Sequence, residues 1–178
     1  MIQGLLPRLI VIRGPSGSGK TTVARLLFER AARRVCLIEQ DHYRFIFRPA
    51  GGGSLPNAAT IHRMIEHNVG AALADGYDVI LEGILSKTSY GEIVGRLLAP
   101  DRARGFLYSF AVSLDETLRR HATRATEDLG FSTDDMRSWF ASGHPYGSTN
   151  ERLILQSSSI DATVERIKYE TGMDKAPT

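Results

Sequence analysis

A segment of eight residues, from Gly14 to Thr21, carries the residue types that bind phosphate groups. Its sequence, GPSGSGKT, fits the Walker A pattern G-x-x-x-x-G-K-[ST]. Glycine lets backbone N–H groups approach an anion without an intervening Cβ, and a following helix points its positive end at the same anion. The Lys20 ammonium can reach the β- and γ-phosphates, and the Thr21 hydroxyl can hold Mg²⁺. The segment therefore predicts a site for ATP and Mg²⁺ with these binding residues: Gly14, Ser16, Gly17, Ser18, Gly19, Lys20, Thr21 and Thr22.

The flanking residues predict the two elements that such a loop needs. Residues 9–12 are a short apolar run typical of a strand buried on both faces, and apolar positions then recur at helical spacing from residue 20 to about 32. The same alternation predicts strands at 35–38, 79–81, 106–112 and 153–155, and helices at 59–74, 90–98, 116–126, 133–140 and from Ser159 or Asp161 to 171. Residues 49–57 predict a loop. We therefore expect an α/β fold with a parallel sheet, helices on both faces, and ligands beyond the carboxyl ends of the strands.

Length and composition narrow the function further. The 178 residues are expected to form one domain, 1–178, and 42% of them are hydrophobic. A net charge of +2 gives no electrostatic case for binding nucleic acid or an anionic membrane. No apolar run reaches membrane-spanning length and no secretion signal is seen, so the expected location is the cytoplasm.

Charged residues also follow the second and third predicted strands, at the edge where a parallel sheet gathers ligand-binding groups. Asp41 and Arg44 stand in the segment DHYR after residues 35–38, and Glu82-Gly83 follows residues 79–81. A carboxylate close to Mg²⁺ and the γ-phosphate can orient a hydroxyl and accept its proton. Structural interpretations stay open at this point. Asp41 could cap a helix that begins near residue 42, and Glu82 could form a hydrogen bond to a neighbouring loop.

Arginine dominates the basic residues, since only four of the 22 Lys and Arg residues are lysine. Genomic base bias and phosphate binding both account for such an excess. The position of each arginine in the sequence must therefore decide between the two explanations. Arg120 and Arg124 are spaced i, i+4 and share one face of the helix predicted at 116–126. A guanidinium there can stack on a base or stabilise charge on a transferring phosphoryl group, and a solvated basic face is the alternative.

Together these motifs resemble the P-loop kinases of small molecules and polynucleotide ends, a group that includes gluconate kinase, chloramphenicol phosphotransferase and polynucleotide 5′-kinase. The resemblance covers nearly the whole chain, and the Walker A loop is its most specific part. It implies a five-stranded parallel sheet of order 2-3-1-4-5 and a lid over approximately residues 119–150.

The resemblance also implies roles for individual residues. In the D-x-x-R motif, Asp41 would accept the proton of the substrate hydroxyl and Arg44 would position the acceptor. Glu82 stands at a Walker B position, where it would hold Mg²⁺ or, with Gly83, contact the substrate. The implied catalytic residues are Lys20, Asp41, Arg120 and Arg124, and Arg120 would also bind the nucleotide.

Three functions fit these motifs. The one we favour is ATP- and Mg²⁺-dependent transfer of the γ-phosphoryl group to a hydroxyl of a small molecule such as a nucleoside, sugar or antibiotic. The second is a polynucleotide 5′-hydroxyl kinase, for which the sequence offers no basic, aromatic-dotted stretch. The third is a regulatory nucleotide-binding or NTPase module, which would need no acceptor site.

Overall fold

The computed structural model describes residues 6–47, 57–101, 103–123 and 132–175, apart from the side chains of 44 and 45, and a five-stranded sheet forms its centre. The strands are β1 (Arg8–Arg13), β2 (Val35–Glu39), β3 (Asp78–Gly83), β4 (Arg104–Ala111) and β5 (Glu151–Leu155). Every neighbouring pair is parallel, and the order is β2-β3-β1-β4-β5. The predicted α/β fold and the sheet order implied by the resemblance are confirmed.

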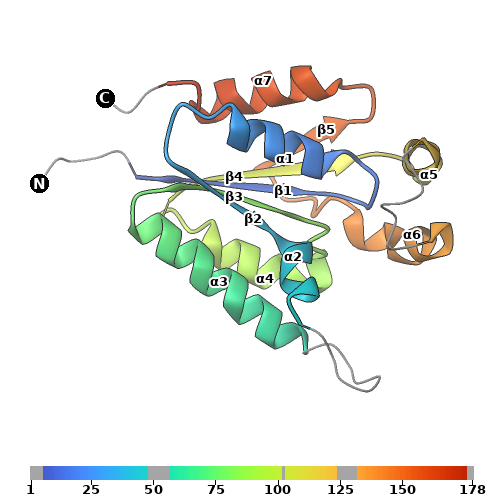
Figure 1. The fold of residues 1–178 in the computed structure, drawn as a ribbon, viewed down its shortest axis with the longest axis horizontal. Helices are drawn as coiled ribbons and strands as arrows, with labels where there is room; N and C mark the ends of the chain where they lie inside the picture. Colours follow the sequence, from blue (N-terminus) through green and yellow to red (C-terminus); the bar gives the residue numbers. More distant parts are fainter. Residues whose placement is uncertain (1–5, 48–56, 102, 124–131, 176–178) are drawn as a thin grey trace, which may run out of the picture.

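Two pairs of helices cover the two faces of the sheet (Figure 1). The helices α1 (Lys20–Glu29) and α7 (Ile160–Thr171) lie on one face, and α3 (Ala58–Ala74) and α4 (Lys87–Leu97) lie on the other. Each pair packs its apolar side chains with strand residues into a separate hydrophobic cluster. Because the sheet is covered on both faces, its central strand β1 is apolar between its two ends and buried along its whole length.

The remaining helices gather at the end of the sheet where the strands finish (Figure 1). The short helix α2 (Gln40–Phe45) directly follows β2, whereas α5 (Leu114–Ala122) and α6 (Thr133–Trp139) come after β4. A 3-10 turn, η2 (Phe140–Gly143), continues α6 toward β5. The Walker A segment joins β1 to α1 at this same edge, so the fold brings the motif together with the residues that follow β2, β3 and β4.

Polar side chains fix where several helices begin. The Ser86 hydroxyl accepts a hydrogen bond from the amide of Ser89, so α4 begins at residue 87 and not at residue 90 as predicted. For α7, the N-cap is Ser159 and not Asp161. Such hydroxyls satisfy amides that the first turn of a helix leaves without a partner.

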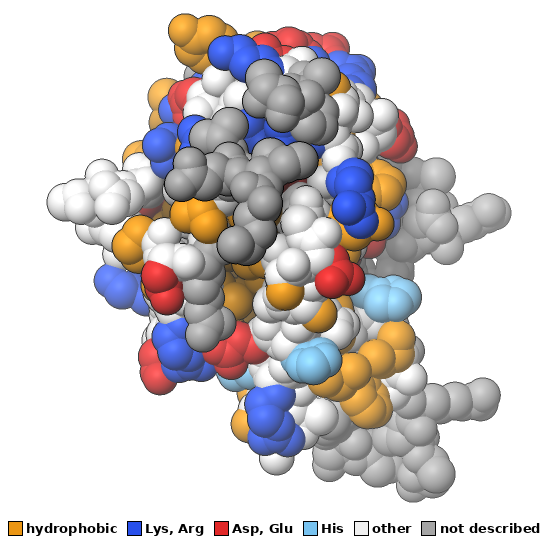
Figure 2. All heavy atoms as spheres, turned by 90° about the vertical axis from the view of Figure 1, so that its left-hand side faces the viewer, with side chains coloured by type: hydrophobic (Ala, Val, Ile, Leu, Met, Phe, Trp, Pro, Cys, Tyr) orange, Lys and Arg blue, Asp and Glu red, His pale blue; other side chains and the backbone are white. Residues whose placement is uncertain are grey.

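Figure 2 shows the end of the molecule where the strands begin. Lys and Arg side chains are interspersed there with Asp and Glu, and no large field of one sign is visible among the described residues. The mixture agrees with the small net charge of +2. Within the described ranges, no helix has both the length and the apolar composition needed to cross a membrane.

A buried ion pair ties together the beginnings of β1 and β3. The Asp78 side chain is 2% exposed and accepts hydrogen bonds from the amide of Arg8 (2.8 Å) and from its guanidinium (3.1 Å). Arg33 Nε donates to the same carboxylate at 3.1 Å. Arg8 also donates to the carbonyls of Thr171 and Gly172, where α7 ends. Loss of Asp78 would therefore leave the buried Arg8 guanidinium without an opposing charge, whereas loss of Arg8 would leave Asp78 paired with Arg33.

We expect Asp78→Ala to lower the free energy of unfolding by about 3 kcal/mol or more, because it strands the buried Arg8 guanidinium. Asp75→Ala removes an exposed carboxylate that follows α3 and should change the same quantity by less than about 0.5 kcal/mol. Urea denaturation followed by circular dichroism measures both values. Equal losses in the two variants would contradict the importance of this ion pair.

Candidate active site

The phosphate loop leaves β1 at Gly14 and enters α1 at Lys20. Gly17 and Gly19 have φ angles of +76° and +98°, in the left-handed region that favours glycine. At Gly14 a side chain is excluded by a steric clash, because a Cβ would lie 2.7 Å from the Cβ of Phe110 on β4. The glycines predicted to bind phosphate are therefore also the residues that the path of the backbone requires.

The first two residues of α1, Lys20 and Thr21, both contact Glu82 near the end of β3. The Thr21 hydroxyl donates to Oε1 of Glu82 at 3.1 Å, and Lys20 Nζ lies 3.5 Å from the same oxygen. This contact follows from the strand register, in which Glu82 is opposite Ile12 of β1 and Glu39 of β2. Glu82 is only 4% exposed, so its carboxylate is largely removed from water.

Burial raises the pKa of Glu82, although the Lys20 ammonium and the hydrogen bond from Thr21 oppose the shift. Repulsion from the Asp41 and Glu39 carboxylates adds to the rise. A cation beside these carboxylates would relieve the repulsion between them. Within the described ranges, no group of three or more His, Cys, Asp or Glu side chains is placed to hold a metal ion. Thr21 and Glu82 would therefore hold Mg²⁺ only together with phosphate oxygens.

Ser18 contributes a buried hydroxyl that has no hydrogen-bond partner within the described part of the chain. Such a group costs free energy unless a ligand satisfies it. Together with the positive N-terminal end of α1, the hydroxyl fits a bound phosphate. Of the other residues predicted to bind it, Ser16 is half-buried in the loop and Thr22 is exposed beside the neighbouring cavity.

Arg120 connects α5 to the phosphate loop. Its Nη1 donates to the carbonyl of Ser18 at 2.8 Å, and its Nη2 donates to the carbonyl of Gln156, just beyond β5, at 3.0 Å. Its Nε donates to Glu116, one turn earlier, at 2.6 Å. Arg119 bonds to Glu116 as well, and the hydrogen bonds from the two arginines lower the pKa of Glu116 to about 2. Of these two arginines, only Arg120 is bonded to the loop in the described structure.

A cavity of about 360 Å³ opens beside the phosphate loop. This volume lies within the range of roughly 300–1,000 Å³ that small-molecule sites occupy. Its walls come from the loop, from α1, from the ends of β4 and β5, from Arg120 and from the first turn of α7. The lining residues are Gly17, Ser18, Gly19, Thr22, Val23, Phe110, Arg120, Leu155, Ser158, Ser159, Ile160 and Thr163.

Asp41 is exposed in the first turn of α2, a helix of six residues that the sequence analysis raised only as an alternative beginning near residue 42. The N-cap position of α2 belongs to Glu39, so the interpretation of Asp41 as a helix cap is wrong. Arg44 lies in the same helix, and its side chain is outside the described part of the structure. Arg124 lies outside the described residues altogether.

Gly83 ends β3 next to the first residue of α2. A Cβ on Gly83 would lie 2.7 Å from the Cβ of Gln40, the first residue of α2. Glycine therefore lets α2 approach the end of β3, which brings Asp41 toward Glu82. The contact of Gly83 with a substrate stays a prediction.

The sequence analysis did not single out Arg13 and Glu151, two buried charged residues behind the phosphate loop. Arg13 Nη1 lies 3.7 Å from Glu151 Oε1, with side chains 0% and 2% exposed. One signal for Arg13 was available, because a basic residue ends an apolar strand directly before the Walker A motif. Glu151 carries no comparable signal, since its partners are distant in the sequence or emerge only from the fold.

Comparison with known proteins identifies a family for the chain. A family model described as "AAA domain" matches residues 9–141, well over half of the chain. No curated protein matches the sequence significantly.

Several solved structures share the fold. A sugar kinase from Janibacter sp. HTCC2649 superposes with a TM-score of 0.71 at 17% identity, over 94% of this chain and 95% of that one. The tunicamycin resistance protein of Deinococcus radiodurans superposes with a TM-score of 0.67 at 17% identity, over 97% of this chain and 99% of that one. A chain of the Pnkp1/Rnl/Hen1 RNA repair complex gives 0.62 at 23% identity, over 80% of this chain and 45% of that one. The protein therefore belongs to the AAA domain family, and its fold is that of the P-loop kinases.

Proposed function

We propose that the protein is an ATP- and Mg²⁺-dependent phosphotransferase that moves the γ-phosphoryl group to a hydroxyl of a small molecule. One observation carries this proposal. The exposed Asp41 follows Gln40, which lies against Gly83 directly after Glu82. Glu82 in turn contacts both Lys20 and Thr21 of the phosphate loop. A module that only binds nucleotide has no need of a second, exposed carboxylate at this place.

The phosphate loop would hold the donor. Backbone amides of residues 14–19 and the Ser18 hydroxyl would bind the phosphates, and Lys20 would turn from Glu82 toward them. Thr21 and Glu82 would hold Mg²⁺, which neutralises charge on the β- and γ-phosphates when bound. The cavity of about 360 Å³ beside the loop would take the nucleoside of ATP, with Arg120 at its wall.

Asp41 would serve the acceptor. Its carboxylate accepts the proton of the substrate hydroxyl while the hydroxyl oxygen bonds to the γ-phosphorus and the bond to the β-phosphate oxygen breaks. Arg44, one turn further along α2, would position the acceptor, with Gly83 at the end of β3 nearby. Arg120 and Arg124 would stabilise charge on the transferring group, and a lid over approximately residues 119–150 would exclude water.

A nucleoside, sugar or antibiotic is the acceptor class that we favour. The structural neighbours include a sugar kinase and a tunicamycin resistance protein, and both are matched over nearly their whole length. The similarity to a chain of an RNA repair complex supports a second candidate, a polynucleotide 5′-hydroxyl kinase. The net charge of +2 argues against it, because a single-strand groove is strongly basic.

A measurement of ATP consumption, alone and with a panel of acceptors, tests this proposal. The panel contains nucleosides, sugars, antibiotics and 5′-hydroxyl oligonucleotides, each with Mg²⁺. We expect one small-molecule class to stimulate ADP formation and to gain a phosphate by mass spectrometry. Stimulation by oligonucleotides alone would favour the second candidate. ATP binding without stimulation by any acceptor would favour a regulatory nucleotide-binding module.

We expect Asp41→Asn to lower kcat by about 100-fold or more while the KM for ATP changes less than about threefold, because the amide cannot accept a proton. The kinetics are measured with the acceptor found in the panel. Asp75→Asn, at the exposed end of α3, is the control and should retain wild-type kcat. An Asp41→Asn variant with most of its kcat would rule out Asp41 as the base.

We expect Arg120→Ala to weaken Mg–ATP binding by about tenfold to hundredfold, since it removes charged donors from the loop and from Gln156. Arg119→Ala is a matched control, because both arginines bond to Glu116 and Arg119 is exposed. Its affinity should change less than about threefold. Isothermal titration calorimetry measures both, and equal losses would show that the connection between Arg120 and the loop is unimportant.

A further inference from the structure

Arg13 is a buried cation placed directly before the phosphate loop. It is the last residue of β1 and is 0% exposed, between Gly83 of β3 and Ser109 of β4 in the strand register. Burial lowers its pKa, so the fold pays a cost to keep a charged guanidinium here. No role in binding phosphate or the acceptor requires a basic side chain behind the loop.

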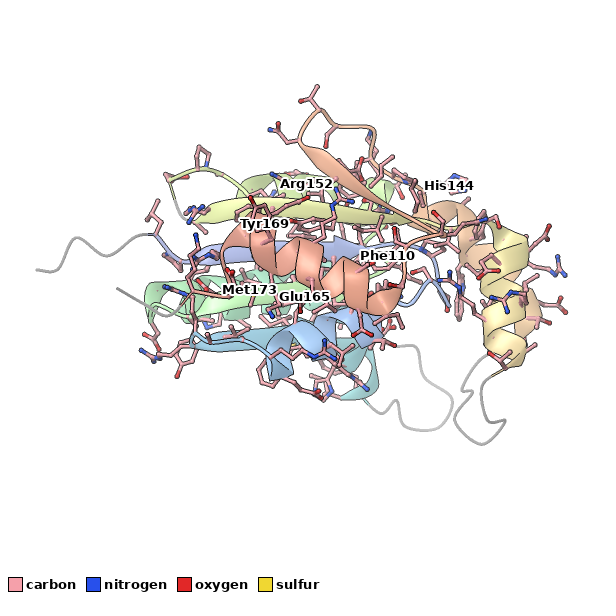
Figure 3. All side chains as sticks on the ribbon, turned by 90° about the horizontal axis from the view of Figure 1, so that it is seen from above. Phe110, His144, Arg152, Glu165, Tyr169 and Met173 are labelled. Atoms are coloured by element: carbon pink, nitrogen blue, oxygen red, sulfur yellow. The ribbon has the colours of Figure 1, made fainter. Side chains whose placement is uncertain are left out.

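The Arg13 guanidinium joins three separate segments of the chain. Its Nε donates to the carbonyl of Leu85, just beyond β3, at 3.0 Å. Its Nη1 donates to the Ser109 hydroxyl at 3.1 Å and to the carbonyl of His144 at 2.8 Å. Its Nη2 donates to the carbonyl of Ser142 at 3.2 Å. Two of these acceptors lie in the segment 142–146, which leads from η2 to β5 (Figure 3, where His144 is labelled).

Tyr146 and Glu151 hold the other end of that segment. The guanidinium carbon of Arg13 lies 4.2 Å from the centroid of the Tyr146 ring, and the Tyr146 hydroxyl donates to the carbonyl of Leu85 at 2.8 Å. Glu151 accepts hydrogen bonds from the amides of Tyr146 (2.8 Å) and Gly147 (2.7 Å) and pairs with Arg13. Arg13 and Glu151, which pair with each other, therefore bond to the segment 142–146 near both of its ends.

This segment lies directly on the backbone of the phosphate loop. A Cβ on Gly143 would lie 2.3 Å from the nitrogen and 2.4 Å from the Cα of Pro15, and 2.8 Å from the carbonyl carbon of Gly14. Such distances leave no room for a side chain between the two backbones. Because Gly143 stands between Ser142 and His144, the two carbonyls bound by Arg13 flank this contact.

We propose that Arg13 is a positioning residue for nucleotide binding. By holding residues 142–146 against Gly14 and Pro15, it fixes the start of the loop whose amides receive the phosphates. The inference rests on the proposed function in one respect, that this loop binds a nucleotide. Amides displaced by a fraction of an ångström bind an anion less well, so the effect of Arg13 reaches the ligand without contact.

Arg13→Met and Arg8→Met form a matched pair that tests this role. Both replace a buried arginine of β1, one at each end of the strand, and both should lower the melting temperature. We expect Arg13→Met to weaken Mg–ATP binding by about tenfold or more, and Arg8→Met by less than about twofold. Calorimetry is done well below both melting temperatures, so a purely structural role would give equal affinities and overturn the inference.

Gly143→Ala tests the same contact from its other side and serves if Arg13→Met does not fold. It leaves every donor of Arg13 in place, and we expect it to weaken Mg–ATP binding by about fivefold or more. Gly95→Ala on α4 is the control, since nothing lies within 4 Å of a Cβ there, and its affinity should be unchanged. Wild-type affinity in Gly143→Ala would overturn the inference. Failure of the wild-type protein to bind Mg–ATP would instead refute the proposed function and this inference with it.

Discussion

A loop that binds phosphate through backbone amides must be held in shape by contacts from other parts of the chain. Glycine allows the path of this loop but contributes no side chain that could anchor it. Phe110 packs on Gly14, and Arg120 bonds to the carbonyl of Ser18. The residues before β5 lie on Pro15. The shape of the loop therefore depends on contacts with β4, with α5 and with the residues before β5.

The electrostatics of the site follow from the placement of Glu82. Its buried carboxylate offsets the charge of Lys20, and repulsion from the exposed Asp41 carboxylate helps to raise its pKa. Two acidic groups near one lysine are poorly balanced in the free chain, and an added cation improves that balance. The excess negative charge of Glu82 and Asp41 therefore favours the binding of a cation.

Much of this architecture could be predicted from local sequence. The apolar runs identified all five strands, and the Walker A spacing identified the loop and the start of α1, because short-range pattern decides both. The order of the strands came from the resemblance. The helix α2 was only an open alternative, since six residues carry too little periodicity to identify a helix and its first residue. Arg13 was missed because its partners Leu85 and His144 are 72 and 131 residues away.

The close approach of Gly143 to Pro15 also bears on how such a chain can diversify. Two backbones touch there with no side chain between them, so an insertion on either side would shift the loop itself. Adaptation to a new ligand must therefore accumulate in connections that this contact does not constrain. The residues around Gly143 and Pro15 must keep their spacing, so changes in chain length are tolerated only away from this contact.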